Sequence, residues 1–417
     1  MKKILFIAPH SFPIRSSESI CNAKVAYCLA EAGYKVDVYT CADKSTYPAD
    51  KELDHFLRTS PNLKIITVSP DYVLLKTLSP LKLLRAIVFN LKILLSTGYF
   101  YNGISIPYLI YKKVEEECGG GGQYDYILSR GYSTDLAAIL LTKKYGVPWI
   151  ANWNDPFPLA KFPPPYGMGS ETKLPFFENR IYKEIQKRAQ LHTFPNPRLR
   201  DYMLKCFSSV SIDQTAVIPH MALSKISPSR SIERSVLKLV HCGNVKNPRN
   251  PRNFLAALSS IKEVIEGKNI RLECHFIGGV DDDIPSFITN NHLESVVFLH
   301  NNMTYKKSID FISKCHVSLV IEAECEEGIY LPTKVVDSFQ CGVPIFCVSP
   351  SNGVLNDIVH SFPVGYFSTN TSMNSIRSAL LSLVDDYQND ELPVISKETV
   401  PSFFEDAIIK QYRNYCD

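Results

Sequence analysis

Residues 326–344 read EEGIYLPTKVVDSFQCGVP, and this stretch indicates the fold. It follows the apolar run VSLVI at 317–321, which is typical of a buried strand. Pro332 suits the first turn of a helix, and Gly342 ends that helix before the apolar run PIFCV at 344–348. The order strand, loop, helix, strand predicts a parallel α/β unit, because parallel strands need a crossover connection.

The same order of elements occurs at two other places in the chain. Near the amino terminus, the run ILFIA at 4–8 precedes a helical pattern at 23–32 and a second apolar run. The order returns at 237–243, where LKLVHCG precedes another helical pattern and the run RLECHFIG. Because each start opens a new parallel sheet, the sequence predicts an α/β protein with two doubly wound, Rossmann-like domains. We place these domains at residues 1–212 and 213–399.

Composition excludes several classes of protein. The net charge of +3 over 417 residues gives no reason to expect a nucleic acid partner. The 12 cysteines are scattered without Cys-x-x-Cys spacing, as expected of reduced thiols in a cytoplasmic protein. The first apolar run is too short for a signal peptide, and no uncharged apolar stretch reaches the roughly 18 residues of a membrane span.

The helix that follows Pro332 carries a cation and a carboxylate on one face. Lys334 and Asp337 are three residues apart, so their side chains project in similar directions. The preceding loop lies at the carboxyl end of a strand, where open α/β sheets bind ligands. A cation near a helix start and a carboxylate one turn later could hold a phosphate group and a pair of sugar hydroxyls, with added anion affinity from the helix amides.

This stretch resembles the signature of family 4 glycosyltransferases, which have the GT-B fold: two Rossmann-like domains that face each other across a cleft. The family pattern is Pro-x-Lys-x-x-Glu-Tyr-x-x-x-Gly-x-Pro, and the matching residues are Pro332, Lys334, Asp337, Gly342 and Pro344. The resemblance implies that Asp337, which replaces the family's Glu, holds the ribose of a nucleotide. The family's other carboxylate falls at Ile329, so we assign the contact with the donor sugar to Glu327, two residues earlier.

Two further loops resemble donor-binding loops of the family. The turn GNVKNPRNPRN at 243–253 implies that Gly243, Asn244 and Arg249 contact the donor diphosphate, with Arg252 as the alternative arginine. Glycine allows close approach of a pyrophosphate, and arginine offers it a two-pronged contact. The loop at 349–353 implies that Asn352 and Gly353 touch the donor phosphate or base.

The first half of the chain resembles the family more diffusely. Arg130 ends one predicted strand, and Asp155 follows the next one in the stretch YGVPWIANWNDP. The resemblance implies that both face the cleft, where they are our candidate catalytic residues. It also implies that residues 1–212 bind the acceptor, that residues 213–399 bind the nucleotide sugar, and that a final helix within 400–417 crosses back to the first domain.

Residues 72–113 form a basic and apolar segment without any acidic residue. Its basic residues are Lys76, Lys82, Arg85, Lys92, Lys112 and Lys113. Such a composition favours a helix that lies on an anionic membrane surface. The alternative is a core helix whose lysines reach out to solvent.

Together these features predict a retaining, metal-independent glycosyltransferase. Its co-substrate would be a nucleoside diphosphate sugar, with UDP preferred over GDP, and it would need no cofactor. The acceptor would be a glycan or a lipid-linked glycan in bacterial surface polysaccharide synthesis, at the inner face of the membrane. Two alternatives remain open: a sugar-nucleotide 2-epimerase of the same fold, and a non-catalytic assembly protein that binds nucleotide sugars.

Overall fold

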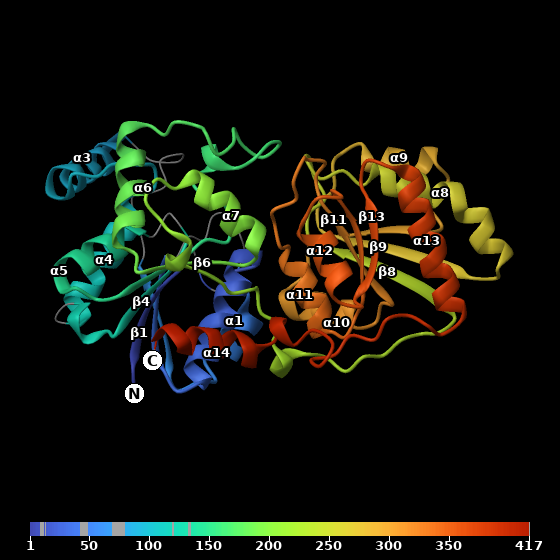
Figure 1. Cartoon of the computed structure of the whole chain (residues 1–417), viewed down its shortest axis with the longest axis horizontal. Coiled ribbons are helices and arrows are strands. Elements are labelled where there is room, and N and C mark those ends of the chain that lie inside the picture. Colours follow the sequence, from blue (N-terminus) through green and yellow to red (C-terminus); the bar gives the residue numbers. More distant parts are fainter. Residues whose placement is uncertain are drawn as a thin grey trace. The chain divides into compact units, whose positions relative to one another are not determined.

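Two compact units make up the protein in a computed structural model (Figure 1), which describes residues 1–8, 12, 14–41, 49–68, 80–118, 121–131 and 135–416. The first unit comprises Met1–Pro163, Gly167–Ile218 and Ile409–Asp417, and the second comprises Pro164–Tyr166 and Pro219–Ile408. The main division therefore falls after Ile218, whereas we predicted it after residue 212. The reason is a short strand, Thr215–Val217, which pairs with the sheet of the first unit.

The first unit contains a seven-stranded sheet in the order β3-β2-β1-β4-β5-β6-β7. All neighbouring strands are parallel. The strands are β1 (Lys3–Ile7), β2 (Lys35–Cys41), β3 (Leu63–Val68), β4 (Tyr126–Arg130), β5 (Trp149–Asn152), β6 (Leu191–Phe194) and β7 (Thr215–Val217). The helices are α1 (Ser17–Glu31), α2 (Lys51–Leu57), α3 (Pro80–Thr97), α4 (Ser105–Cys118), α5 (Asp135–Tyr145), α6 (Phe176–Arg188), α7 (Pro197–Cys206) and most of α14 (Glu405–Cys416).

The second unit contains a six-stranded sheet in the order β10-β9-β8-β11-β12-β13, again with parallel neighbours. The strands are β8 (Val236–Cys242), β9 (Arg271–Ile277), β10 (Val297–His300), β11 (Val317–Ile321), β12 (Ile345–Ser349) and β13 (Gly365–Thr369). The helices are α8 (Arg252–Gly267), α9 (Ile284–Asn290), α10 (Tyr305–Ile312), α11 (Thr333–Gln340), α12 (Val354–Ser361) and α13 (Met373–Gln388). Two Rossmann-like, doubly wound sheets are therefore confirmed.

Strand β12 shows why a central strand of the second sheet reads as an apolar run. Successive side chains of a strand point to opposite faces of the sheet. Phe346 and Val348 join the core under α8, α9 and α13, whereas Ile345 and Cys347 join the core under α11 and α12. Figure 1 shows these two groups of helices on opposite faces of the sheet. Since both faces are covered, alternation with polar residues would bury unpaired polar groups.

Two helical segments differ from their predicted extent. Helix α1 begins at Ser17 rather than at residue 23, because the Ser16 side chain accepts a hydrogen bond from the Ser19 amide and caps the first turn. The predicted membrane-surface segment divides into α3 and α4, and residues 72–79 lie outside the described part of the chain. Within the described ranges, no helix is long and apolar enough to span a membrane.

Candidate functional site

The predicted donor-binding residues lie on loops at the edge of the second sheet where the strands end. The strand order reverses between β8 and β11, and open α/β sheets bind ligands at such a reversal. Helices α11 and α12 follow β11 and β12, and the residues that precede them, Pro332 and Gly353, provide no side-chain cap. By contrast, Asn250 accepts a hydrogen bond from the first amide of α8, and Thr304 and Ser372 cap α10 and α13. The starts of α11 and α12 therefore make this part of the edge favourable for an anion.

Two cations and one buried carboxylate meet beside the end of β8. The Nε atom of Arg249 lies 3.4 Å from Oε1 of Glu322, which follows directly on β11. The Nζ atom of Lys334 lies 2.9 Å from Nε2 of His241. Lys334 also borders Gly243, since a Cβ atom there would be 3.7 Å from Nζ. The structure thus brings together three predicted donor-binding residues, Gly243, Arg249 and Lys334. The two cations carry more charge than the single carboxylate of Glu322 can neutralise.

The environment of this cluster shifts the pKa values of its members. Burial, and then the charge of Arg249, lower the pKa of Lys334 to about 8. Burial also lowers the pKa of His241 well below its ordinary value, and the charges of Lys334 and Arg249 add to this effect. The lysine ammonium can only donate, so the neutral His241 ring accepts a hydrogen bond from Lys334 through Nε2. The Glu322 carboxylate raises the pKa of Arg249, which therefore stays charged.

The pKa of Lys334 predicts how the affinity for the expected nucleotide, UDP, would depend on pH. The charged form of Lys334 is the form that attracts a diphosphate, and this charge is lost as the pH rises through about 8. We expect the Kd for UDP to rise about tenfold between pH 7 and pH 9, measured by titration calorimetry. In the matched variant Lys334→Arg the charge persists, so the Kd should stay nearly constant. An equal rise in both proteins would assign the pH dependence to another group.

The loop that carries Arg249 is held by contacts with the loop after β9. The Oδ1 atom of Asn244 accepts a hydrogen bond from the amide of Gly279 at 2.8 Å. Arg252, the alternative phosphate-binding arginine, forms an ion pair with Asp283. The predicted residue Asn244 therefore shapes the loop, and Arg249 is the arginine that lies beside Lys334.

Asp337 lies one turn after Lys334 on α11 and faces α10. Its Oδ1 atom accepts a hydrogen bond from the hydroxyl of Tyr305 at 2.8 Å. Burial raises the pKa of Tyr305, and the negative charge of Asp337 raises it further, so the phenol keeps its proton. Tyr305 thereby orients the carboxylate for which a ribose contact is predicted, and that contact stays a prediction.

The loops that carry Glu327 and Asn352 pack directly against each other. The Gly328 amide donates to the Asn352 carbonyl, and the Val354 amide donates to the Gly328 carbonyl, both at 2.8 Å. Gly328 and Gly353 form a parallel bridge, in which a Cβ atom on Gly353 would lie 3.1 Å from the Cα atom of Gly328. The structure thus places Glu327, Asn352 and Gly353 together at the starts of α11 and α12.

The two catalytic candidates of the first unit lie in different environments. Arg130 ends β4 and is buried, with Nε donating to Asn22 Oδ1 at 2.7 Å and Nη1 donating to the Tyr412 hydroxyl at 3.2 Å. These contacts attach α14 to the first sheet and favour a structural role for Arg130. Asp155 follows β5 and is only partly buried, so it stays the candidate for direct contact with an acceptor.

Sequence reasoning missed Glu322, His241 and Tyr305. His241 and Glu322 are polar residues within or directly after apolar strands, at the point where the strand order reverses. Polar residues in such places are a signal that could have been used, because burying them is costly without a partner or a ligand. Tyr305 carries no comparable signal, since its partner Asp337 is distant in sequence.

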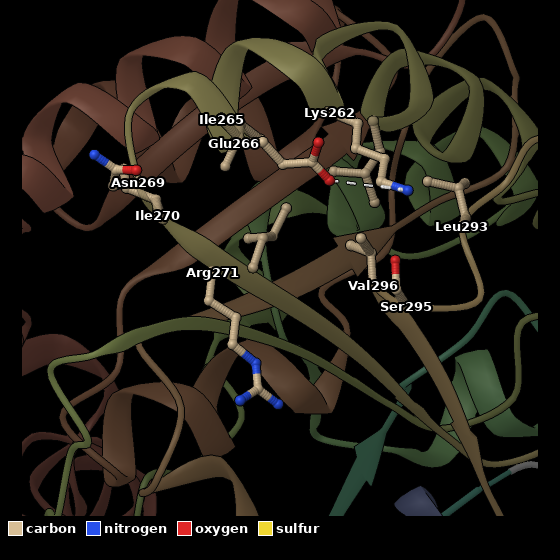
Figure 2. Close-up of a pocket in the computed structure, with 11 residues that line it drawn as sticks. Lys262, Ile265, Glu266, Asn269, Ile270, Arg271, Leu293, Ser295 and Val296 are labelled. Atoms are coloured by element: carbon tan, nitrogen blue, oxygen red, sulfur yellow. Dashed lines mark ion pairs between the residues drawn. The ribbon is translucent and has the colours of Figure 1, made fainter.

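A separate cavity of about 410 Å³ lies at the opposite edge of the second sheet, near the start of β9 (Figure 2). Its floor is apolar, and Lys262 and Glu266 of α8 form an ion pair with a distance of 3.9 Å at its rim. None of the predicted donor-binding residues lines this cavity. We therefore do not assign the donor site to it.

No protein-family model matches the chain, and no curated protein matches it by sequence. Solved structures, however, match it over its whole length. Sucrose-phosphate synthase from Thermosynechococcus elongatus is 15% identical with a TM-score of 0.68, and the match covers 100% of this chain and 98% of that one. Anabaena HepE, solved with UDP and glucose, is 12% identical with a TM-score of 0.67 and coverage of 100% and 99%. The chain has the GT-B fold.

The GT-B fold confirms the architecture that the sequence predicted. The lipopolysaccharide outer core galactosyltransferase WaaB also matches, at 14% identity, a TM-score of 0.56 and coverage of 99% and 98%. At such low identities the similarity establishes the fold alone. Membership of family 4 and the role of each residue therefore stay predictions.

Proposed function

We propose that this GT-B protein is a glycosyltransferase that moves a sugar from a nucleoside diphosphate sugar to an acceptor hydroxyl. The observation that carries the proposal is the excess of positive charge around Arg249 and Lys334, placed beside uncapped helix starts at the reversal of a Rossmann-like sheet. This arrangement suits a diphosphate. We propose UDP as the nucleotide, because HepE of the same fold was solved with UDP and glucose.

The same cluster would promote the reaction electrostatically. When the bond between sugar and diphosphate breaks, negative charge builds up on the departing UDP. Arg249 and Lys334 would stabilise that charge, and such preorganised stabilisation often contributes more to an enzyme's rate enhancement than any other single effect. Because two protein cations supply the positive charge, we propose a metal-independent reaction without a cofactor.

The other predicted residues would orient the donor around this cluster. Asp337, held by Tyr305, would bind the ribose hydroxyls. Glu327 would bind hydroxyls of the donor sugar, and the loop of Asn352 and Gly353 would contact the phosphate or the base. We propose retention of configuration, in which the donor phosphate takes the proton of the acceptor, with Asp155 as the alternative base.

We propose a glycan or a lipid-linked glycan of a bacterial surface polysaccharide as the acceptor, bound by the first unit. This acceptor is supported by the exposed apolar surface of α3, because such a surface is typical of proteins that contact a membrane. A cytoplasmic protein at the inner face of a membrane would reach an acceptor whose lipid is embedded there.

Release of UDP tests the proposal. The purified protein is incubated with UDP-glucose, UDP-galactose or UDP-N-acetylglucosamine and with a lipid extract that contains glycan acceptors, and free UDP is measured. We expect acceptor-dependent release in the wild type and a loss of release in Lys334→Ala. Conversion of the donor sugar without an acceptor would instead identify a 2-epimerase. Donor binding without release or conversion would identify a non-catalytic binding protein.

A further inference from the structure

Helix α3 of the first unit exposes an unusual amount of apolar surface. Five of its apolar residues, spaced at intervals of three and four, are between 51% and 79% exposed: Leu81, Leu84, Val88, Leu91 and Leu95. This spacing places them in one stripe along the helix. Ala86 and Ile93 on the other side are buried, and Phe89 packs edge-on against Tyr108 of α4 with ring centroids 5.9 Å apart. One apolar side of α3 therefore packs against the first unit, and a second apolar side is exposed to solvent.

Aromatic residues from a distant part of the sequence adjoin the end of this stripe. Arg180 of α6 donates to the carbonyl of Gly98, just beyond α3, at 2.9 Å. Phe177 links the exposed rings of Phe100 and Phe176, with centroids 6.1 Å and 5.2 Å from its own ring. We name the exposed α3 stripe together with Phe100 and Phe176 the apolar face. Phenylalanine and leucine side chains together are typical of the apolar side of a helix that lies on a membrane surface.

The charges beside the stripe indicate whether it binds a second copy of the chain or a lipid surface. Arg85 and Lys92 are exposed on α3, each directly after a leucine of the stripe, and the helix has no acidic residue. Because every charged residue of α3 is a cation, a pair of α3 helices from two copies would bring like charges together with no opposite charge to pair with them. An anionic lipid surface would attract the same cations while it buries the apolar side chains.

We propose that the apolar face docks the protein on the surface of an anionic lipid bilayer, with α3 lying in the plane of the headgroups. This inference rests on the proposed function, because docking on a membrane would bring the protein to a lipid-linked acceptor. The membrane-surface segment predicted at residues 72–113 is thereby reduced to α3 and Phe100, to which Phe176 of α6 is added. Helix α4 is not part of it, because none of the exposed large apolar side chains of the described residues lies on α4.

The experiment measures binding of the full chain to vesicles of phosphatidylcholine, with and without phosphatidylglycerol, by co-sedimentation. We expect the double variant Leu84→Ser/Leu91→Ser to bind anionic vesicles at least about tenfold more weakly than the wild type. The double variant Arg85→Gln/Lys92→Gln should lose most of the preference for anionic over neutral vesicles. The control is Val394→Ser, which changes an even more exposed apolar residue of the second unit and should bind as the wild type does.

Two results would overturn the proposal. Wild-type vesicle binding by Leu84→Ser/Leu91→Ser would show that the apolar face does not contact lipid. A wild-type dimer in sedimentation velocity that dissociates in this variant would show that the apolar face binds a second copy. Calorimetry with UDP in the absence of vesicles separates this test from that of the proposed function, because the α3 variants should bind UDP as the wild type does.

Discussion

Replacement of Arg249 by alanine is expected to lower kcat/KM for sugar transfer by about 100-fold or more. Arg249 forms an ion pair with the buried carboxylate of Glu322, and its charge acts on Lys334. Its loss removes positive charge from the place where UDP would depart and leaves Glu322 to repel the diphosphate. Steady-state kinetics with the donor sugar, combined with calorimetry of UDP binding, would measure both effects.

Two control variants make this result specific. Arg252→Ala removes a neighbouring arginine whose partner is Asp283, and we expect it to change kcat/KM by less than about threefold. Because Arg249→Ala leaves a buried carboxylate unpaired, it should also destabilise the fold. The pair Arg249→Leu/Glu322→Leu should regain stability in thermal unfolding while it stays inactive. Near-normal activity of Arg249→Ala together with a large loss in Arg252→Ala would transfer the phosphate-binding role to Arg252.

Replacement of Gly278 by alanine is expected to lower the free energy of unfolding by about 2–4 kcal/mol. Gly278 follows β9 with φ +130°, a conformation that strains any residue with a Cβ atom. The added atom would lie 2.8 Å from both the carbonyl carbon and the oxygen of Gly243, so backbone rather than a flexible side chain must move. Since Gly243 borders Lys334, this movement should also weaken UDP binding.

Gly267→Ala is the matched control for this prediction. Gly267 ends α8, and a Cβ atom there would meet nothing within 4 Å. We expect stability to be unchanged or raised by about 0.5–1 kcal/mol, because alanine favours the helix over the unfolded chain. Urea denaturation of both variants gives the comparison. Equal stabilities would mean that the close contact between Gly278 and Gly243 does not constrain the loop.

Patterns along the chain were enough to predict the architecture and the edge of the second sheet where the candidate site lies. Apolar runs bounded by loop residues predicted nearly every strand, because strands covered on both faces are mostly apolar. The position of Lys334 at a helix start after such a strand located the candidate site, since the topology of parallel sheets brings strand ends and helix starts to one edge. These features follow from local order along the chain.

The partners of individual residues and the exposed surfaces could be found only from the folded chain. It paired Arg249 with Glu322 and Asp337 with Tyr305, and it buried Arg130 against α14. It also left the leucines of α3 exposed, although their spacing equally suits a core helix. The physical reason is that a residue's burial and charge environment depend on elements that are remote in sequence and meet it only after folding, and periodicity along one segment carries no information about them.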